Sequence, residues 1–456
     1  MSAYQQFLAS KAVAATRNGL TRVPALAPHL FSFQASCVEH ALTMGRAGNF
    51  LDTGLGKTEC QLEWSRHASE ATNGRALILT PLAVAQQTKR RADQWGYEAR
   101  VIRDQSEAGP GINICNYDRL EKLDPSYFGC VSLDEGSILK SLMGSTKRAL
   151  VDAFREHRFR LVATATPAPN DHMELGNYAE FLGVMTANEL LSRWFINDTS
   201  TASQEWRLKG HAERDFWDWM ASWARMAQLP SDLLGGDDTG FVLPPFELRR
   251  HKAKHSDVKL TDGLFGVNMS ATSMHDVKRQ TADARAETIA GLVPKGEPFI
   301  IWCDTDYEAD ALKLAVPDAV EIRGSMSIDD KEARLEAFAA HGGILIAKPQ
   351  MCGYGLDWSH CARMAFVGRS YSYETYYQAV RRCWRFGQKR QVIVDLVVAE
   401  GEDSIGRVID RKADGHARMR SQMREAMQRA AGKATKTKIV YNPTHQGRLP
   451  SWLFAA

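Results

Sequence analysis

The 456-residue sequence has no long apolar run, no paired cysteine motif and no apolar secretory signal at its start. No stretch approaches the ~18 apolar residues that cross a bilayer, which excludes the transmembrane classes and predicts no membrane partner. The eight cysteines are scattered without a CxxC pair, so neither a zinc ribbon nor a redox motif is expected. At 44% hydrophobic and 24% charged residues, the composition also excludes disordered and disulfide-rich classes. We therefore expect a cytoplasmic location.

Acidic residues are missing before Glu39, a pattern shared with organellar transit peptides, although a helical lead over residues 1–30 is the interpretation we favour. Charge is also uneven along the chain. Residues 404–456 hold 11 Lys and Arg against 3 Asp and Glu, a net charge of +8, while the whole chain carries only +3. This basic C-terminal extension favours a polyanionic partner, and a solvated, partly disordered end is the alternative.

Two stretches of the chain alternate between strand-like and helix-like patterns. Apolar runs fall at 76–80, 112–115, 131–133 and 161–164, and again at 299–302, 344–347, 364–367 and 392–394. Helical spacing appears at 83–95, 328–340 and 374–386. Alternating strands and helices predict crossover connections and parallel sheets. The fold class is therefore α/β, with a first lobe over 31–182 and a second lobe over 291–403.

The alternation of strand-like and helix-like patterns stops between the lobes, over 183–290. Phe216, Trp219, Met220 and Trp223 recur there at helical spacing. We interpret this stripe as the core of a mainly helical insertion, and a base-stacking platform is the alternative.

A glycine-bearing loop, residues 52–58 (DTGLGKT), follows the short apolar run 49–51 and precedes a helical pattern. Glycines let backbone N–H groups turn toward phosphate oxygens, and the start of a helix adds positive partial charge. Lys57 would neutralise the β- and γ-phosphates, and the Thr58 hydroxyl would bind Mg²⁺. The first glycine of the usual P-loop is absent, because Leu51 stands there. The expected nucleotide-binding residues of the loop are Thr53, Gly54, Leu55, Gly56, Lys57 and Thr58.

The apolar run 131–133 ends in two carboxylates, Asp134 and Glu135. At the carboxyl end of a parallel strand, Asp134 is placed to hold the water shell of the metal ion. Glu135 is placed to orient and deprotonate an attacking water. An acidic turn without a function is the alternative, which the P-loop in the same lobe makes the weaker interpretation.

Gln378, Arg382 and Arg385 are four and three residues apart, so the predicted helix over 374–386 places them on one face. This face is either a solvated surface or aimed at a phosphate. Arginine suits a phosphate because its planar fork donates hydrogen bonds in pairs and stays charged.

These residues resemble superfamily 2 helicases, and most closely the SWI/SNF-type double-stranded DNA translocases, including bacterial and phage versions. In the QxxxRxxRxGQ motif of that family, Arg382 and Arg385 are the arginine fingers. Further stretches match in order: Gln34 as adenine reader, Thr80 and Pro81 as contacts to the nucleic-acid backbone, and Thr164, Thr166, Gly353, Gly355, Asp357 and Gln378 as residues that link nucleotide state to nucleic acid. Two positions depart from the pattern, because Ser137 stands where many relatives carry histidine and Arg381 where glycine is frequent.

The resemblance implies two tandem RecA-like lobes, ATP and Mg²⁺ as cofactors, and Lys57, Glu135, Arg382 and Arg385 as catalytic residues. It implies an ATP-dependent translocase or helicase on duplex DNA, bound without sequence preference, in a bacterial or phage-infected cell. Replication or recombination proteins are possible further partners. An RNA-dependent ATPase and a non-catalytic DNA-binding adaptor with a relic nucleotide site are the alternatives.

Overall fold

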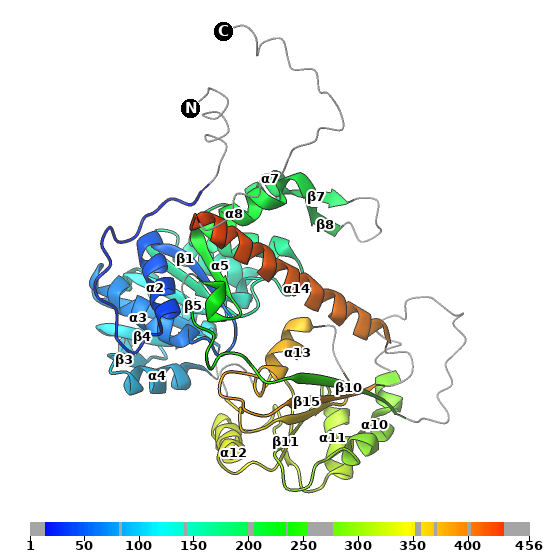
Figure 1. The fold of residues 1–456 in the computed structure, drawn as a ribbon. Helices are drawn as coiled ribbons and strands as arrows, with labels where there is room; N and C mark the ends of the chain where they lie inside the picture. Colours follow the sequence, from blue (N-terminus) through cyan, green and yellow to red (C-terminus); the bar gives the residue numbers. More distant parts are fainter. Residues whose placement is uncertain are drawn as a thin grey trace, which may run out of the picture.

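A computed structural model describes residues 14–81, 84–140, 144–198, 205–233, 236–253, 277–351, 357–368, 372–398 and 403–432. Two parallel sheets form two separate lobes, and a long C-terminal helix lies across both (Figure 1). This confirms the α/β fold class with two tandem lobes of the RecA type. Within these ranges no helix is both long enough and apolar enough to cross a bilayer; the longest has 28 residues.

The first lobe is built on a seven-stranded sheet in the order β3-β4-β2-β5-β6-β1-β9. Its central strands are buried on both faces, as parallel strands covered by helices require. The strands are β1 (Arg46–Leu51), β2 (Arg75–Thr80), β3 (Ala99–Val101), β4 (Gly111–Asn116), β5 (Cys130–Asp134), β6 (Phe159–Ala163) and β9 (Ala224–Ala227). The helices of this part of the chain are α2 (Ser32–Met44), α3 (Lys57–Glu70), α4 (Ala85–Gln94), α5 (Ser145–Ala153), α6 (Leu175–Leu182), α7 (Ala187–Trp194) and α8 (Glu213–Trp223).

The second lobe is built on a six-stranded parallel sheet in the order β10-β15-β14-β11-β13-β12. The strands are β10 (Phe246–Lys252), β11 (Phe299–Trp302), β12 (Val320–Glu321), β13 (Ile344–Ala347), β14 (Arg363–Phe366) and β15 (Val392–Val398). The helices are α10 (Ala282–Ala290), α11 (Asp306–Ala315), α12 (Ile328–His341) and α13 (Tyr373–Val380). All eight apolar runs predicted as strands fall in strands of the two sheets.

The segment 183–290 differs from the predicted separate insertion. Its strand β9 pairs with β1 in the first sheet, and β10 pairs with β15 in the second. Both are edge strands; β9 has only four residues, and the exposed charges of β10 hide its apolar pattern in the sequence. The remainder of the segment is α7, α8 and the antiparallel hairpin of β7 (Phe195–Asp198) and β8 (Glu205–Leu208).

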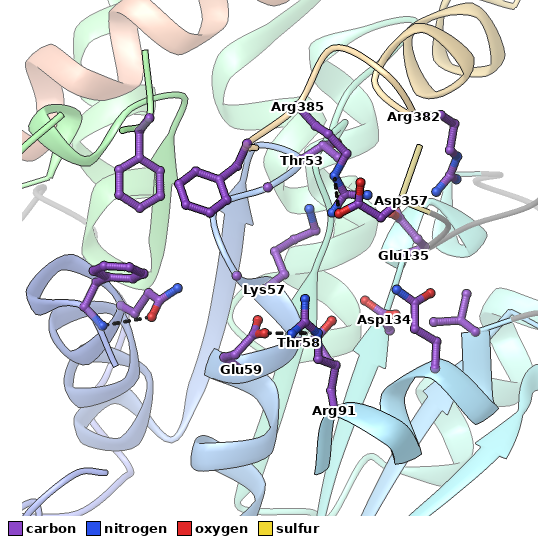
Figure 2. A pocket seen from close by; sticks show the side chains of 18 of the residues that line it. Thr53, Lys57, Thr58, Glu59, Arg91, Asp134, Glu135, Asp357, Arg382 and Arg385 are labelled. Carbon is purple, nitrogen blue, oxygen red and sulfur yellow. Dashed lines mark hydrogen bonds and ion pairs between the residues drawn. The ribbon is translucent and has the colours of Figure 1, made fainter. Parts of the chain in front are cut away.

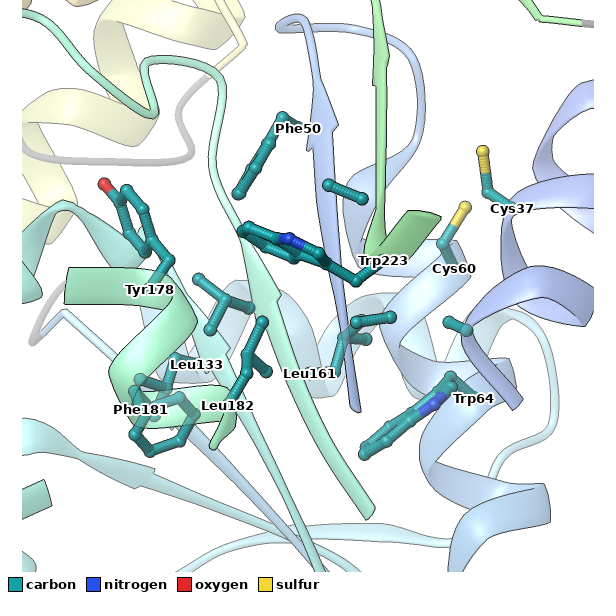
Figure 3. Close-up of a cluster of buried hydrophobic side chains, with 14 of the residues drawn as sticks. Cys37, Phe50, Cys60, Trp64, Leu133, Leu161, Tyr178, Phe181, Leu182 and Trp223 are labelled. Carbon is teal, nitrogen blue, oxygen red and sulfur yellow. The ribbon is translucent and has the colours of Figure 1, made fainter. Parts of the chain in front are cut away.

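The tryptophan stripe of α8 is core, as predicted. Phe216, Trp219, Met220 and Trp223 are at most 1% exposed. Figure 3 shows Trp223 lying over the first sheet close to Phe50 of β1, with ring centroids 6.1 Å apart. The stripe thus fixes α8 to the first lobe and leaves no face for base stacking.

The C-terminal extension begins as α14 (Asp403–Ala430), a helix that packs on both lobes. Met419, Met423 and Met427 belong to the core of the first lobe, whereas Ile409 packs against Tyr373 of the second. The part of the extension beyond residue 432 lies outside the described residues. Over its described length, the extension is therefore a structural element of both lobes.

Candidate active site between the lobes

The carboxyl ends of β1, β6 and β5 meet at one edge of the first sheet, because these strands are neighbours. The P-loop follows β1, Thr164 follows β6, and Asp134 and Glu135 stand at the end of β5. A pocket of about 280 Å³ opens at this edge. Figure 2 shows its two sides, with Lys57, Asp134 and Glu135 on one and Arg382 and Arg385 on the other.

The P-loop turns on two glycines with positive φ, Gly54 at 92° and Gly56 at 77°. A Cβ at Gly56 would lie 2.1 Å from Nε2 of Gln34, so a side chain here would displace the Gln34 amide. Helix α3 begins at Lys57, so its first backbone N–H groups point toward the pocket end of the helix. The Lys57 ammonium donates a hydrogen bond of 3.1 Å to the carbonyl of Leu51. The loop is therefore a cradle that a Cβ would fill.

Gln34 lines the same pocket, and its amide is already bonded within the first lobe. Its Oε1 accepts a hydrogen bond from the Phe31 N–H at 3.0 Å, and its Nε2 donates to the Leu55 carbonyl at 3.0 Å. Gln34 thus ties the start of α2 to the P-loop. Leu55 itself is buried and contributes its backbone, whereas Thr53, Gly54, Gly56, Lys57 and Thr58 all line the pocket.

Glu135 has a left-handed backbone, with φ 50°, and is the one non-glycine residue with positive φ within the described ranges. Such strain is found mainly where a side chain must point in a set direction. Its Oε2 accepts a hydrogen bond of 3.2 Å from the Thr164 hydroxyl. Burial raises the pKa of Asp134 to about 7; the neighbouring Glu135 adds to this shift and Lys57 opposes it. Burial also raises the pKa of Glu135, against the charges of Lys57 and Arg382.

The arginine segment differs from the predicted helix over 374–386, because α13 ends at Val380. Beyond that point, the carbonyl of Arg382 accepts from the Trp358 N–H at 3.0 Å, and the carbonyl of Cys383 accepts from Gln388 Nε2 at 3.2 Å. The first of these bonds joins distant parts of the chain and the second spans only five residues, and turns take the place of a continuous helix here. Gln378, Arg382 and Arg385 therefore do not share a helix face.

Turns nevertheless bring Gln378, Arg382 and Arg385 to the same pocket. Arg385 Nε lies 3.6 Å from Asp357 Oδ2, and burial lowers the pKa of Arg385. Nε2 of Gln378 is buried without a hydrogen-bond partner, so a donor at the pocket wall is left for a ligand. The three side chains thus converge as predicted, although turns and not a shared helix face place them there.

Of the residues expected to link the lobes, Thr164 and Thr166 do not line the pocket. Thr164 and Thr166 are fully buried, and the Thr166 N–H donates to Thr164 Oγ1 at 3.2 Å. The Thr166 hydroxyl reaches Glu374 of α13 at 3.5 Å, and Glu374 also pairs with Lys140 at 2.7 Å. A hydrogen-bonded path therefore runs from Glu135 to the second lobe. Asp357 lines the pocket, while Gly353 and Gly355 lie outside the described residues.

Thr80 and Pro81 lie at the end of β2. In the sheet, β5 and β6 separate β2 from β1, the strand that precedes the P-loop. Thr80 is fully buried, and its hydroxyl donates to the carbonyl of Pro81 at 3.1 Å. Pro81 is partly exposed. The predicted contact of Thr80 and Pro81 with a nucleic-acid backbone stays a prediction.

Several pocket residues were not predicted. Phe31, Phe241 and Phe386 form an aromatic cluster beside the P-loop, in which the rings of Phe241 and Phe386 stack with centroids 4.8 Å apart. Arg91 of α4 also lines the pocket, 3.6 Å from Glu59. Phe386 lies within the arginine motif, so the motif could have predicted its place at the pocket. Phe241 lies in no recognisable motif, so the sequence holds no signal for it.

Residues 284–387 match the family model of the helicase conserved C-terminal domain. The match runs from α10 to the turns that carry Arg382 and Arg385. The second lobe is thus similar to the helicase conserved C-terminal domain. This finding confirms the predicted likeness to the helicases, and the bacterial or phage origin stays a prediction.

Among solved structures, this chain is similar to the Sulfolobus solfataricus SWI2/SNF2 ATPase core in complex with double-stranded DNA. The TM-score is 0.41 at 13% sequence identity, over 90% of this chain and 97% of that one. No curated protein matches the sequence at a significant level.

The pocket residues fit a nucleoside triphosphate with its metal ion. The donors are a lysine, two arginines and a helix start, which suit an anion, and the glycine cradle leaves space beside them. Within the described ranges, no three His, Cys, Asp or Glu side chains form a metal-binding group. Magnesium is usually held by one or two protein ligands together with phosphates and water, so Thr58 and Asp134 match its needs.

Proposed function

We propose that the chain is an ATP-dependent DNA translocase or helicase, which hydrolyses ATP between its lobes and moves along duplex DNA. The observation that carries the proposal is a single pocket with the P-loop and two carboxylates on one wall and two arginines of the helicase C-terminal lobe on the other. Phosphoryl transfer needs little covalent chemistry from a protein but requires positioning and positive charge around the γ-phosphate. This pocket supplies both.

Each lobe has its own task in the proposed reaction. Lys57 and the first N–H groups of α3 would hold the phosphates, and Thr58 and Asp134 would hold the metal ion. Magnesium, when bound there, would supply positive charge that neutralises the phosphates. Glu135 would orient the attacking water and accept its proton. Arg382 and Arg385 would stabilise the γ-phosphate, a contribution worth ~10³–10⁵ in rate for arginine fingers.

We attribute movement along DNA to a pocket that has one wall on each lobe. ATP would contact both walls and favour the closed cleft, and loss of the γ-phosphate would remove that link. The path Glu135–Thr164–Thr166–Glu374 supports such a coupling, because it joins the site of hydrolysis to α13. If both lobes grip phosphate backbone, each cycle advances the protein along the strand. Duplex DNA is proposed from the family resemblance of residues 378–388.

The proposal assigns DNA contacts to only part of the basic extension. Arg420, Arg424 and Arg429 of α14 pair with Asp52, Asp232 and Asp218 of the first lobe, so they are engaged within the protein. Residues 433–456 carry four further basic residues and no acidic one. Deleting 433–456 leaves α14 intact and is expected to flatten the salt dependence of DNA affinity by ~0.9 per lost phosphate contact. An unchanged slope would dismiss a role of this segment in DNA binding.

The decisive experiment measures ATP turnover by the full chain with duplex DNA, single-stranded DNA, RNA and no nucleic acid. We expect turnover to rise most with duplex DNA. Stimulation by RNA alone would favour the RNA-dependent alternative. ATP binding without turnover under all four conditions would favour the adaptor with a relic site.

A further inference from the structure

Asp52, the residue directly after β1, is a buried carboxylate that three segments share; it is 2% exposed. Its Oδ1 accepts hydrogen bonds from the Thr53 N–H, at 2.7 Å, and from the Tyr377 hydroxyl. Its Oδ2 lies 3.0 Å from Arg381 Nη2 and 3.4 Å from Arg420 Nη1. One carboxylate therefore meets two guanidinium groups and a phenol.

The two guanidinium groups belong to different bodies of the molecule. Arg381 directly follows α13 and moves with the helicase C-terminal lobe. Arg420 lies between Met419 and Met423, which are buried in the core of the first lobe. Arg424, one turn further, also pairs with that lobe, 3.5 Å from Asp232. The second half of α14 is thus part of the first lobe, where Asp52 itself stands.

Asp52 also shapes the start of the P-loop. Its carbonyl accepts from the Leu55 N–H at 3.2 Å, and its side chain holds the Thr53 N–H. Arg381 adds a hydrogen bond of 2.9 Å to the Thr53 carbonyl. Burial alone would raise the pKa of Asp52, but Arg381, Arg420, Tyr377 and the Thr53 N–H outweigh burial and lower it. The carboxylate is therefore charged at the entrance of the loop that would cradle the nucleotide.

We infer that Arg381 and Arg420 are positioning residues with opposite effects on cleft closure, an inference that rests on the proposed cycle of lobe movement. Arg381 reaches Asp52 when the lobes are together, so it favours the closed cleft. Arg420 stays beside Asp52 when the lobes part, so it favours the open cleft relative to the closed one.

The opposite effects of Arg381 and Arg420 on closure follow from their charges. Together, the two arginines and Asp52 carry a net charge of +1, and the two guanidinium groups repel each other across the shared carboxylate. Opening removes Arg381 and Tyr377, and a carboxylate that loses all its partners is strongly destabilising. Arg420 prevents this loss. Its attraction to Asp52 acts in both states, whereas its repulsion from Arg381 acts only in the closed cleft, so its removal makes opening harder.

The test measures the closed-to-open ratio by energy transfer between dyes on the two lobes. Dyes are attached at Lys122→Cys and Leu314→Cys, two exposed positions in the first and second lobes, in a Cys352→Ser background. The seven cysteines within the described ranges are all buried, which favours labelling at the new sites. Each variant is measured with and without a non-hydrolysable ATP analogue and Mg²⁺.

We expect Arg381→Gln to lower the closed-to-open ratio about tenfold and Arg420→Gln to raise it by about the same factor, a change of ~1.4 kcal/mol each. The matched control Arg424→Gln removes a half-exposed ion pair from the same helix and is expected to leave the ratio within about twofold. Arg420→Lys keeps the charge and is expected to behave as the unmodified protein.

An Arg381→Gln background separates charge repulsion from mere structural support, because Arg420→Gln is expected to have no further effect on the ratio there. Arg420→Gln opening the cleft as Arg381→Gln does, or either variant leaving the ratio unchanged, would overturn the inference. If Arg420→Gln does not fold, Arg420→Lys and Arg381→Gln still decide: a raised ratio in the first or an unchanged ratio in the second contradicts it. Closure is read without turnover, so absence of ATPase activity would defeat the proposed function alone.

Discussion

The two walls of the pocket are built in different ways. The first-lobe wall consists of loops that directly follow neighbouring parallel strands, so Lys57, Asp134 and Glu135 are set by a rigid sheet. The second-lobe wall consists of turns after α13, in which the Arg382 carbonyl is bonded to the distant Trp358 N–H. We call the first the fixed wall and, in keeping with the proposed closure of the cleft, the second the movable wall.

The largest expected effect is on the fixed wall, at the proposed base. Glu135→Gln keeps the size of the side chain but removes the group that accepts a proton, so turnover should fall by ~10³ or more. Binding of an ATP analogue should persist, because the phosphate donors are unchanged. Turnover within a few-fold of the unmodified protein would contradict the role given to Glu135.

A second prediction concerns the cradle of the fixed wall. Gly56→Ala should weaken affinity for the ATP analogue by tenfold or more, ~1.4 kcal/mol, because a Cβ would lie 2.1 Å from Gln34 Nε2. Gly74→Ala is the matched control, since Gly74 has a similar positive φ of 75° but nothing within 4 Å of its would-be Cβ. Equal loss of affinity in both variants would assign the effect to backbone strain rather than to the cradle.

A third prediction concerns the aromatic contact between the walls. Phe386 stacks on Phe241 and lies against Gly54, so it helps to seat the arginine turns on the P-loop. Phe386→Ala should raise KM for ATP several-fold, in line with ~0.5–1.5 kcal/mol for an aromatic pair. Leu314→Ala, at a side chain 82% exposed on the same lobe, should change nothing and serves as control. An unchanged KM in Phe386→Ala would show that the contact does not matter for binding.

The smallest effect on activity is expected at Glu63, a buried carboxylate whose partners all belong to the first lobe. It accepts from the Ala27 N–H at 2.7 Å and from Tyr97 at 2.8 Å, and it pairs with Arg66 at 2.8 Å and His67 at 3.1 Å. Burial alone would raise its pKa, but these donors outweigh burial and lower the pKa to about 2. Glu63→Gln should therefore reduce the free energy of unfolding at neutral pH by ~3 kcal/mol and leave turnover per folded molecule unchanged.

The same group gives the expected pH dependence. A lowered folded-state pKa adds stability that is complete above the unfolded value, about 4.3, and that disappears as the pH falls toward about 2. The stability difference between the unmodified protein and Glu63→Gln should thus shrink between pH ~5 and ~2. A constant difference over that range, measured by chemical denaturation, would rule out Glu63 as its source.

Much of the fixed wall could be predicted from the sequence because its signals are local. A buried strand followed by Gly54, Gly56 and Lys57, and another followed by Asp134 and Glu135, are patterns readable within ten residues. Parallel pairing then brings the strand ends together without further information.

The remainder depends on contacts between distant residues. The end of α13 at Val380 follows from bonds to residues 358 and 388, which no periodicity reveals. The edge strands β9 and β10 are short or charged and take their form from the sheets they join. Asp52 gains its partners more than 300 positions away, so neither its role nor that of Arg420 has a local signal.

The central claim is that guanidinium groups of the movable wall act on a nucleotide held by the fixed wall. The most direct test measures ATP turnover by Arg382→Ala/Arg385→Ala at saturating ATP and duplex DNA, with analogue binding as a check that the P-loop is intact. The account predicts a loss of ~10³ or more in kcat with binding largely retained. A kcat within about twofold of the unmodified protein would contradict it.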